Sequence, residues 1–146
     1  MDAGIVDEDR HRTHAIFDAP TVAGLGGIGI DVLASGVTIQ NMVVTNAGET
    51  GIRTDPAFNG FRLKKSVFIA NANGLYFHSS GLPESSVKAN CFRQNQLAGI
   101  RTRYGLDDAV ISKNLFFETA LAAAIIVDQE PGSTTDRLEV IANKSQ

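Results

Sequence analysis

Short stretches of apolar residues recur along the chain, each interrupted after a few positions by Gly, Asn or Ser. Within a stretch, apolar and polar residues alternate. In GIRTR, residues 99–103, Ile100 and Thr102 would lie on one side of an extended chain. The other side would take Arg101 and Arg103. Stretches this short are typical of strands, and the residues between them of turns. The pattern therefore predicts short strands with one face inward and one face outward.

The strands repeat at a nearly constant spacing. GIRT occurs at residues 51–54 and again at 99–102, and related segments lie between and beyond these two. The five related segments are GIGID, GIRTD, GLYFH, GIRTR and AIIVD, which begin at residues 27, 51, 74, 99 and 124. Their steps of 24, 23, 25 and 25 residues indicate a repeat architecture.

A second pattern keeps the same step: an apolar residue, two others, Asn or Ser, one other, an aromatic residue, two others, then Asn or Thr. Its positions are Leu63, Ser66, Phe68 and Asn71, then Val87, Asn90, Phe92 and Asn95, then Ile111, Asn114, Phe116 and Thr119. We expect one turn to hold an asparagine ladder, in which side-chain amides bond the backbone and the neighbouring coil. Its members would be Asn41, Ser66, Asn90, Asn114 and Asn143.

Three strands per unit make a coil, and coils stacked about 4.8 Å apart make a parallel β-solenoid. Equivalent residues would then lie above one another. One interior stack would hold Ile28, Ile52, Leu75, Ile100 and Ile125, and the stack beside it Ile30, Thr54, Phe77, Thr102 and Val127. Phe68, Phe92 and Phe116 would form a third.

Over residues 24–146, the apolar, x, x, Asn, x, Phe segment followed by GIR or GIxI resembles the repeat of pectate lyase-like proteins. The resemblance implies an all-β fold, a right-handed parallel β-helix of about five coils. It also implies that residues acting on polysaccharide lie on the sheet that begins at the repeated Gly, and it favours an extracellular or periplasmic location. A leucine-rich repeat has a similar period and is the alternative. Ile, Val and Phe replace its Leu here, and a further alternating strand follows each Asn turn.

The repeat divides the chain into residues 1–23, an N-terminal segment that could form a partial coil, and the β-helix of residues 24–146. Neither end carries a recognisable cap, and stopping at VIANKSQ would leave strand edges unpaired. We therefore expect a piece of a longer β-helix, with possible self-association through uncapped coil ends.

Charge narrows the range of partners. The 146 residues carry a net charge of −3, and neither Lys nor Arg forms a run, which argues against nucleic acid as a partner. No apolar run reaches transmembrane length, so we expect no membrane insertion, and the charged N-terminus does not read as a signal peptide. The single cysteine, Cys91, excludes an internal disulfide framework.

The outward residues of the repeated strands are the candidate site, because stacking would bring them together. One predicted column is Gly29, Arg53, Tyr76, Arg101 and Ile126, and the other is Asp31, Asp55, His78, Arg103 and Asp128. The connections HSSGLPESS and DQEPGSTTDR leave the ends of these strands and would wall the face on one side.

These residue types suit a polymer of sugar acids. His78 and Asp55 could exchange protons, with Arg101 as a possible base and Tyr76 as a possible acid or a platform for a sugar ring. We expect Arg53, Arg103, Asp31 and Asp128 to bind substrate, the arginines by pairing with carboxylates. The reaction class would be that of a lyase, epimerase or hydrolase.

The alternative is a β-helix module without catalysis, whose outward charges stabilise each other across strands by about 0.2–1 kcal/mol per pair. No cofactor or metal site is predicted. A calcium ion would need more oxygen ligands than the loop around Asp107 and Asp108 offers.

Overall fold

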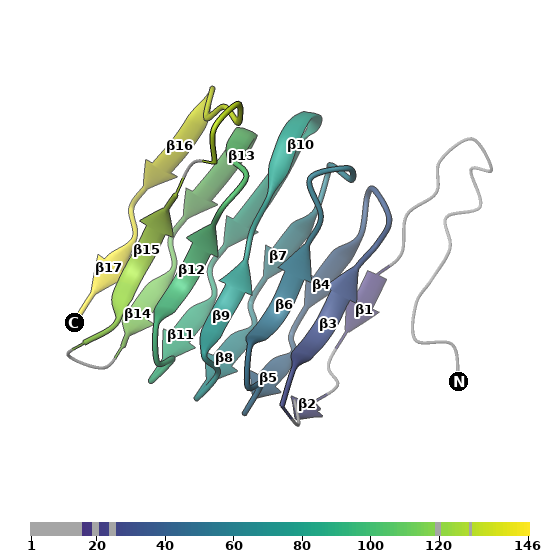
Figure 1. Cartoon of the computed structure of the whole chain (residues 1–146). Helices are drawn as coiled ribbons and strands as arrows, with labels where there is room; N and C mark the ends of the chain where they lie inside the picture. The colour runs from purple at the N-terminus through teal and green to yellow at the C-terminus, as the bar shows by residue number, and fades with distance from the viewer. Residues whose placement is uncertain (1–15, 19–20, 24–25, 119–120, 129) are drawn as a thin grey trace.

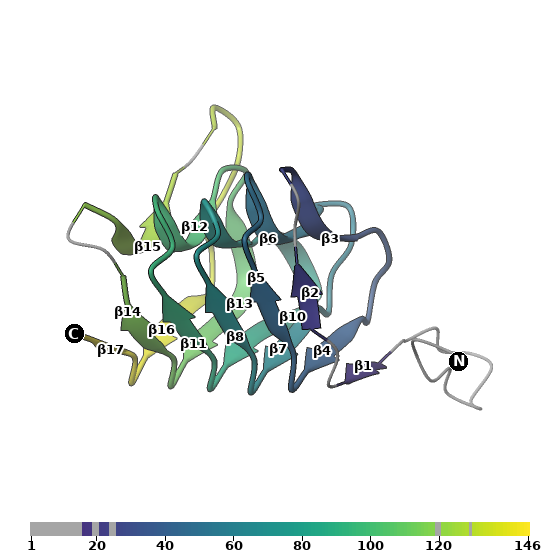
Figure 2. The ribbon, with the colours of Figure 1, turned by 90° about the horizontal axis from the view of Figure 1, so that it is seen from below.

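The computed structural model describes residues 16–18, 21–23, 26–118, 121–128 and 130–146. These residues form strands and turns wound into a parallel β-helix, with three sheets running along its length (Figure 1). Seen from below, the sheets enclose a common interior (Figure 2). The expectation of an all-β parallel solenoid is confirmed. The five strands of one sheet are joined by four full turns, slightly fewer than the five coils expected.

Each coil contributes one strand to each sheet. Sheet A contains β1 (Ile16–Asp18), β4 (Thr38–Gln40), β7 (Arg62–Lys64), β10 (Ser79–Lys88), β13 (Leu106–Ser112) and β16 (Leu138–Ile141). Sheet B contains β2 (Thr21–Ala23), β5 (Val43–Thr45), β8 (Val67–Ile69), β11 (Cys91–Arg93), β14 (Leu115–Phe117) and β17 (Lys144–Ser145). Sheet C contains β3 (Ile28–Val32), β6 (Thr50–Thr54), β9 (Asn73–Tyr76), β12 (Ala98–Thr102) and β15 (Ala123–Val127).

The interior consists of stacks of equivalent side chains, as the alternating pattern predicts. The rings of Phe68 and Phe92 stack with centroids 4.9 Å apart, and those of Phe92 and Phe116 with centroids 5.1 Å apart. Ile52, Leu75 and Ile100 are fully buried beside one another. Aromatic and branched apolar side chains thus fill the coil interior, which supplies most of the favourable free energy of such a fold.

The first coil is displaced by two residues from the predicted stacking. The structure pairs Ile30, and not Ile28, with Ile52, and it pairs Asp31 with Arg53. In the observed register Gly29 belongs to a glycine column with Gly51, Gly74 and Gly99. A Cβ on Gly29 would lie 2.6 Å from the carbonyl oxygen of Gly51, so position 29 must be glycine. The predicted register also placed a glycine, Gly27, beside Gly51. Because apolar residues alternate throughout β3, either register would bury an apolar face.

The turn between sheets A and B also differs by one residue in the first coil. Here Met42, and not Asn41, lies opposite Ser66, whose hydroxyl accepts a hydrogen bond of 3.1 Å from the Met42 amide. Asn41 instead adopts a positive φ of 52° at the preceding position. Asparagine tolerates this left-handed conformation better than most residues. Asn41 therefore indicated that a turn occurs here, but it did not indicate which residue stacks on Ser66.

In the later coils of the same turn, side-chain amides connect successive coils. The Oδ1 atom of Asn114 accepts hydrogen bonds from the backbone and side-chain nitrogens of Asn90, at 2.9 and 3.0 Å. Asn143 accepts the corresponding pair from Asn114, at 3.0 and 2.9 Å. Buried polar groups at this turn are therefore paired, as burial requires.

The turn between sheets B and C follows the same plan. Asn71 accepts from the amide of Ala47 at 2.9 Å, and Glu118 accepts from the amide of Asn95 at 2.6 Å. The predicted Thr119 lies outside the described residues. A carboxylate at Glu118 can take the acceptor role of an asparagine oxygen because both of its oxygens accept.

Candidate functional site

The outward column of sheet C brings charged and aromatic side chains from separate coils together. In β6 and β12 a single partly exposed arginine stands between buried neighbours, because alternate residues of a strand face opposite sides. Strand pairing places five residues side by side: Asp31, Arg53, Tyr76, Arg101 and Ile126.

Arg53 binds Asp31 of the preceding coil through two hydrogen bonds. Its Nε and Nη2 atoms lie 3.1 and 2.7 Å from the two carboxylate oxygens of Asp31. This pairing is the main reason that the pKa of Arg53 is raised above its usual value. The corrected register of the first coil creates this contact, and it occupies both oxygens of Asp31 and two donors of Arg53.

Arg101 and Arg103 are paired with acids of the next coil. The Nε and Nη2 atoms of Arg101 lie 3.2 and 3.0 Å from one oxygen of Asp128. Arg103 forms an ion pair with Glu130, which raises the pKa of Arg103. All three arginines of the predicted site therefore have a carboxylate partner within the chain.

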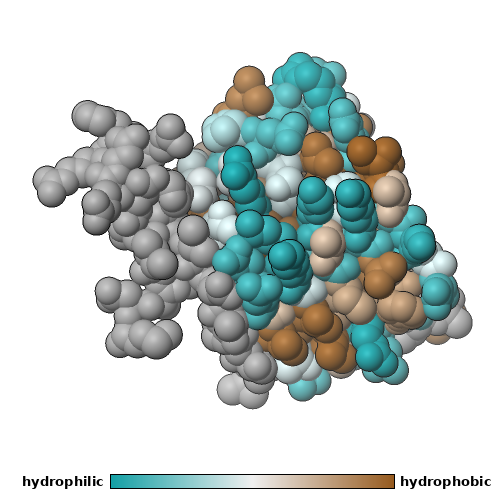
Figure 3. Space-filling view, turned by 180° about the vertical axis from the view of Figure 1, so that it is seen from behind, coloured by the Kyte–Doolittle hydropathy of each residue, from teal (hydrophilic) through white to brown (hydrophobic). Residues whose placement is uncertain are grey.

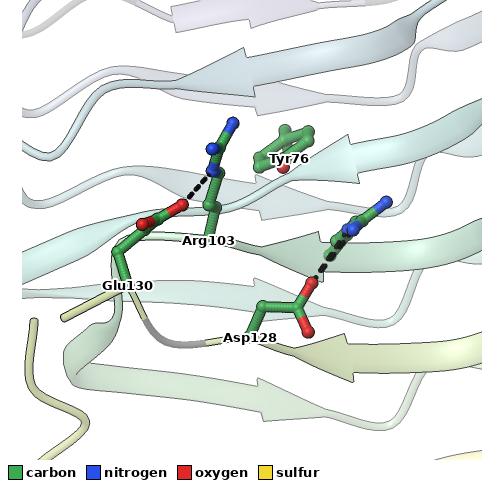
Figure 4. Close-up of a pocket in the computed structure, with 5 residues that line it drawn as sticks. Tyr76, Arg103, Asp128 and Glu130 are labelled. Carbon is green, nitrogen blue, oxygen red and sulfur yellow. Dashed lines mark hydrogen bonds and ion pairs between the residues drawn. The ribbon is translucent and has the colours of Figure 1, made fainter.

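These side chains surround an open cleft of about 410 Å³, shown in Figure 4. Its lining residues are Tyr76, Arg101, Arg103, Asp128 and Glu130. The two cations and two anions balance, so the cleft has no net formal charge at neutral pH. Alternating donors and acceptors around one aromatic ring can bind a ligand rich in hydroxyl groups.

Glu130 was not among the predicted site residues. It lies in the connection after β15 that was expected to wall the face, and the length of this connection was its only signal in the sequence. The backbone amide of Glu130 donates to the carbonyl of Arg103 at 2.9 Å, which holds it beside the cleft.

The rest of this connection is attached to the preceding coil by acidic side chains. Asp107 accepts a 2.7 Å hydrogen bond from the amide of Asp136, and Asp108 binds the guanidinium of Arg137 at 2.7 Å. The pKa of Asp108 is lowered, chiefly by Arg137. The acidic pair at residues 107 and 108 thus anchors a loop.

His78 lies beneath the face and outside the lining of the cleft. Only 2% of its surface is exposed, and its ring contacts those of Tyr76 and Tyr104, with centroids 5.2 and 5.1 Å away. Its Nδ1 atom lies 2.7 Å from the carbonyl oxygen of Thr54. A carbonyl can only accept, so Nδ1 carries the proton and Nε2 carries a lone pair.

The Nε2 atom of His78 is buried and has no hydrogen-bond partner among the described residues. Burial is the largest cause of the lowered pKa of His78; the hydrogen bond to Thr54 and the charge of Asp55 oppose it. Asp55 itself closes a turn, where its Oδ1 accepts from the amide of Ala57 at 2.8 Å. The predicted proton-exchanging pair is thus not part of the cleft lining.

Among the described residues, no group of three or more His, Cys, Asp or Glu side chains is arranged to hold a metal ion. The described residues also include no helix with the length and apolar character needed to cross a bilayer.

Comparison with known proteins agrees with the architecture. No curated protein and no solved structure shows significant similarity to the chain. The family described as right handed beta helix region matches residues 4–144, nearly the whole sequence. With the three parallel sheets and their recurring 24-residue register, this match shows that the chain belongs to the right-handed β-helix family.

Proposed function

We propose that this protein binds an extended carbohydrate in the cleft around Tyr76 and does not process it. The observation that carries the proposal is the cleft's composition: one tyrosine ring among two arginines and two acids whose charges balance. A sugar ring offers an apolar face to an aromatic side chain and hydroxyl groups that both donate and accept. The size of the cleft, about 410 Å³, is within the usual range for small ligands.

Charge balance argues for hydroxyl-rich units in this cleft. The carboxylates of Asp128 and Glu130 already bind the arginines that a sugar acid would need. An acidic sugar would have to displace these carboxylates, and it would meet like charge in doing so. Neutral or sparsely charged units can instead bind the remaining donors and acceptors with the ion pairs intact.

The geometry supports binding better than turnover. General acid–base catalysis needs a titrating group within hydrogen-bond reach of the substrate. Neither His78 nor Asp55 lines the cleft, and the free lone pair of His78 is buried. Of the four predicted catalytic residues, Tyr76 and Arg101 do line the cleft, and Arg101 is paired there with Asp128. The lyase, epimerase or hydrolase hypothesis would also need His78 and Asp55 to move into the cleft.

A panel of soluble neutral and acidic polysaccharides, tested by affinity electrophoresis and calorimetry, examines the proposal. Tyr76→Ala should weaken binding by about tenfold, the loss of roughly 1.4 kcal/mol expected for an aromatic contact, and Tyr76→Phe should restore most of it. Arg101→Gln should also weaken binding, because Arg101 lines the cleft. Arg53→Gln is its matched control and should not, because Arg53 lies in the same column but outside the cleft lining.

The proposal fails if no neutral polysaccharide binds, or if Tyr76→Ala binds the neutral polysaccharide as tightly as the parent protein. It also fails if the protein cleaves or epimerises a uronate polymer in a reaction that His78→Gln abolishes. That result would establish the catalytic hypothesis in place of simple binding.

A further inference from the structure

The structure separates the chain's charges onto different faces. The four arginines around sheet C and its loops, Arg53, Arg101, Arg103 and Arg137, each form an ion pair with an acid. Five other cations lie on sheet A and on the turn that follows it, and all are exposed. This cationic row consists of Arg62, Lys64, Lys65, Lys88 and Lys113.

Members of the cationic row come from three successive coils. Lys64 and Lys88 are directly paired in register on β7 and β10, which places their backbones about 4.8 Å apart. Lys65 and Lys113 occupy equivalent positive-φ positions of the next turn, two coils apart, with Ala89 between them. The row therefore follows the long axis of the β-helix with a regular spacing.

Within the described part of sheet A, no acidic residue flanks the middle of this row. From β4 to β13, the positions that flank the buried central residue of each strand are Thr38, Gln40, Arg62, Lys64, Ser86, Lys88, Val110 and Ser112. Glu139 on β16 and Asp18 on β1 hold register positions at the two ends of the sheet. Among the side chains that the structure describes, none forms an ion pair with a member of the row.

Like charges on adjacent strands repel, so this arrangement weakens the fold slightly. Four surface arginines elsewhere in the same chain have acidic partners. A chain with net charge −3 nevertheless carries a face of five cations that form no ion pair with the side chains the structure describes. Figure 3 looks onto the molecule from behind, where hydrophilic side chains stand out over the middle of the surface. An anionic partner would remove the repulsion.

We propose that the cationic row on sheet A binds a linear anionic polysaccharide, at a site separate from the cleft on sheet C. The flanking side chains of Thr38 and Ser86 add hydroxyl groups that suit sugar hydroxyls. Single-stranded nucleic acids are bound on basic surfaces that also carry aromatic side chains for stacking. The described flanking positions of sheet A from β4 to β13 include no aromatic residue.

A pair of double variants with equal net charge tests this site. Lys64→Gln with Lys88→Gln removes two members of the row, whereas Arg93→Gln with Lys144→Gln removes two cations from sheet B. Binding to polygalacturonate and to a sulfated glycan is measured by calorimetry at low and at physiological salt, with dextran as the neutral polymer. Heat denaturation followed by circular dichroism checks that both variants fold.

The row variant should bind the anionic polymers about 25-fold more weakly at low salt, roughly fivefold for each exposed ion pair lost. The sheet B variant should change binding less than twofold. Affinity of the parent protein should fall as salt screens exposed charges beyond about 8 Å. The row variant should melt no lower than the parent protein, because it removes a repulsion.

Equal weakening in the two variants would overturn the proposal, since net charge alone would then explain binding. Tighter binding to single-stranded DNA or to vesicles of anionic lipid than to either glycan would also overturn it. Tyr76→Ala should leave this binding unchanged. Loss of cleft binding and loss of row binding are therefore separate results, and either proposal can fail alone.

Discussion

His78 is joined to Thr54 of the preceding coil by three hydrogen bonds. The backbone amide of His78 donates to the Thr54 hydroxyl at 2.7 Å, and the Nδ1 atom of His78 donates to the Thr54 carbonyl at the same distance. The threonine hydroxyl in turn donates to the carbonyl of His78 at 3.2 Å. These hydrogen bonds hold His78 two residues after the end of β9, where only 2% of its surface is exposed.

Stability should therefore fall in mild acid. The pKa of His78 is lowered in the folded protein below its ordinary value of about 6.5. A group whose folded pKa is depressed binds its proton more readily when unfolded. The contribution of His78 to stability is fully present above about pH 6.5. Below that pH the free energy of unfolding falls by up to about 1.4 kcal/mol per pH unit, until the pH reaches the pKa of His78 in the folded protein.

Chemical denaturation measured between pH 7.5 and 5 checks this dependence. His78→Gln should flatten the profile in that range, although its stability at pH 7.5 will be lower. Arg53 lowers the pKa of His78 and Asp55 raises it, so neither residue alone accounts for the dependence of stability on pH. A variant profile as steep as that of the parent protein would exclude His78 as the cause.

Asn90→Ala should be strongly destabilising. Asn90 is 2% exposed; its side chain accepts from the amide of Ser66 at 3.0 Å and donates to the carbonyl of Leu63 at 3.1 Å. Removing it leaves buried partners unpaired, at a cost of about 3 kcal/mol. Urea denaturation measures the loss, and the exposed Gln96→Ala should lie within about 0.5 kcal/mol of the parent protein.

Gly51→Ala should disturb the glycine column of sheet C. A Cβ there would lie 2.6 Å from the carbonyl oxygen of Gly74 and 3.0 Å from a methyl group of Val44. Backbone atoms must shift to relieve this overlap, at a cost of about 1–3 kcal/mol. Gly27→Ala is the matched control, since a Cβ there meets nothing within 4 Å. Similar melting temperatures for the two variants would contradict the close approach.

The ion pair between Arg53 and Asp31 should contribute little to stability. Both side chains are well exposed, at 40% and 31% of their surface. Pairs of this kind are worth about 0.2–1 kcal/mol, and salt screens them. A double-mutant cycle with Arg53→Gln and Asp31→Asn measures the coupling. A coupling above about 2 kcal/mol that is unchanged in 1 M salt would contradict the expectation that this exposed pair contributes little to stability.

Local pattern was enough to predict the architecture. Alternation within each strand predicts which residues face inward, and Ile100 and Phe92 are fully buried as expected. The period of 24 residues predicts that coils stack, because each coil can bury its apolar side chains only against its neighbours. These properties depend on residues close together in sequence or on one repeated spacing.

The candidate site was predicted less completely. The sequence grouped Tyr76 with Arg101 on one outward column, and the structure places them side by side. It did not predict that Arg101 would be paired with Asp128 or that His78 would be buried. The chain bends at the end of β9, so alternation stops there: Phe77 and His78 are both buried although they are adjacent.

The sequence by itself therefore determined the repeat, the strands and the inward side of each coil. Only the tertiary structure decided the partners across coils. A shift of two residues keeps the apolar face of β3 inward and places a glycine, Gly27 or Gly29, beside Gly51 in either case, so the pattern could not choose between registers. The structure places Gly29 there. The same stacking brings Lys64 beside Lys88 and Asp31 beside Arg53. Charge neighbours in a solenoid depend on register, and register depends on backbone contacts between coils.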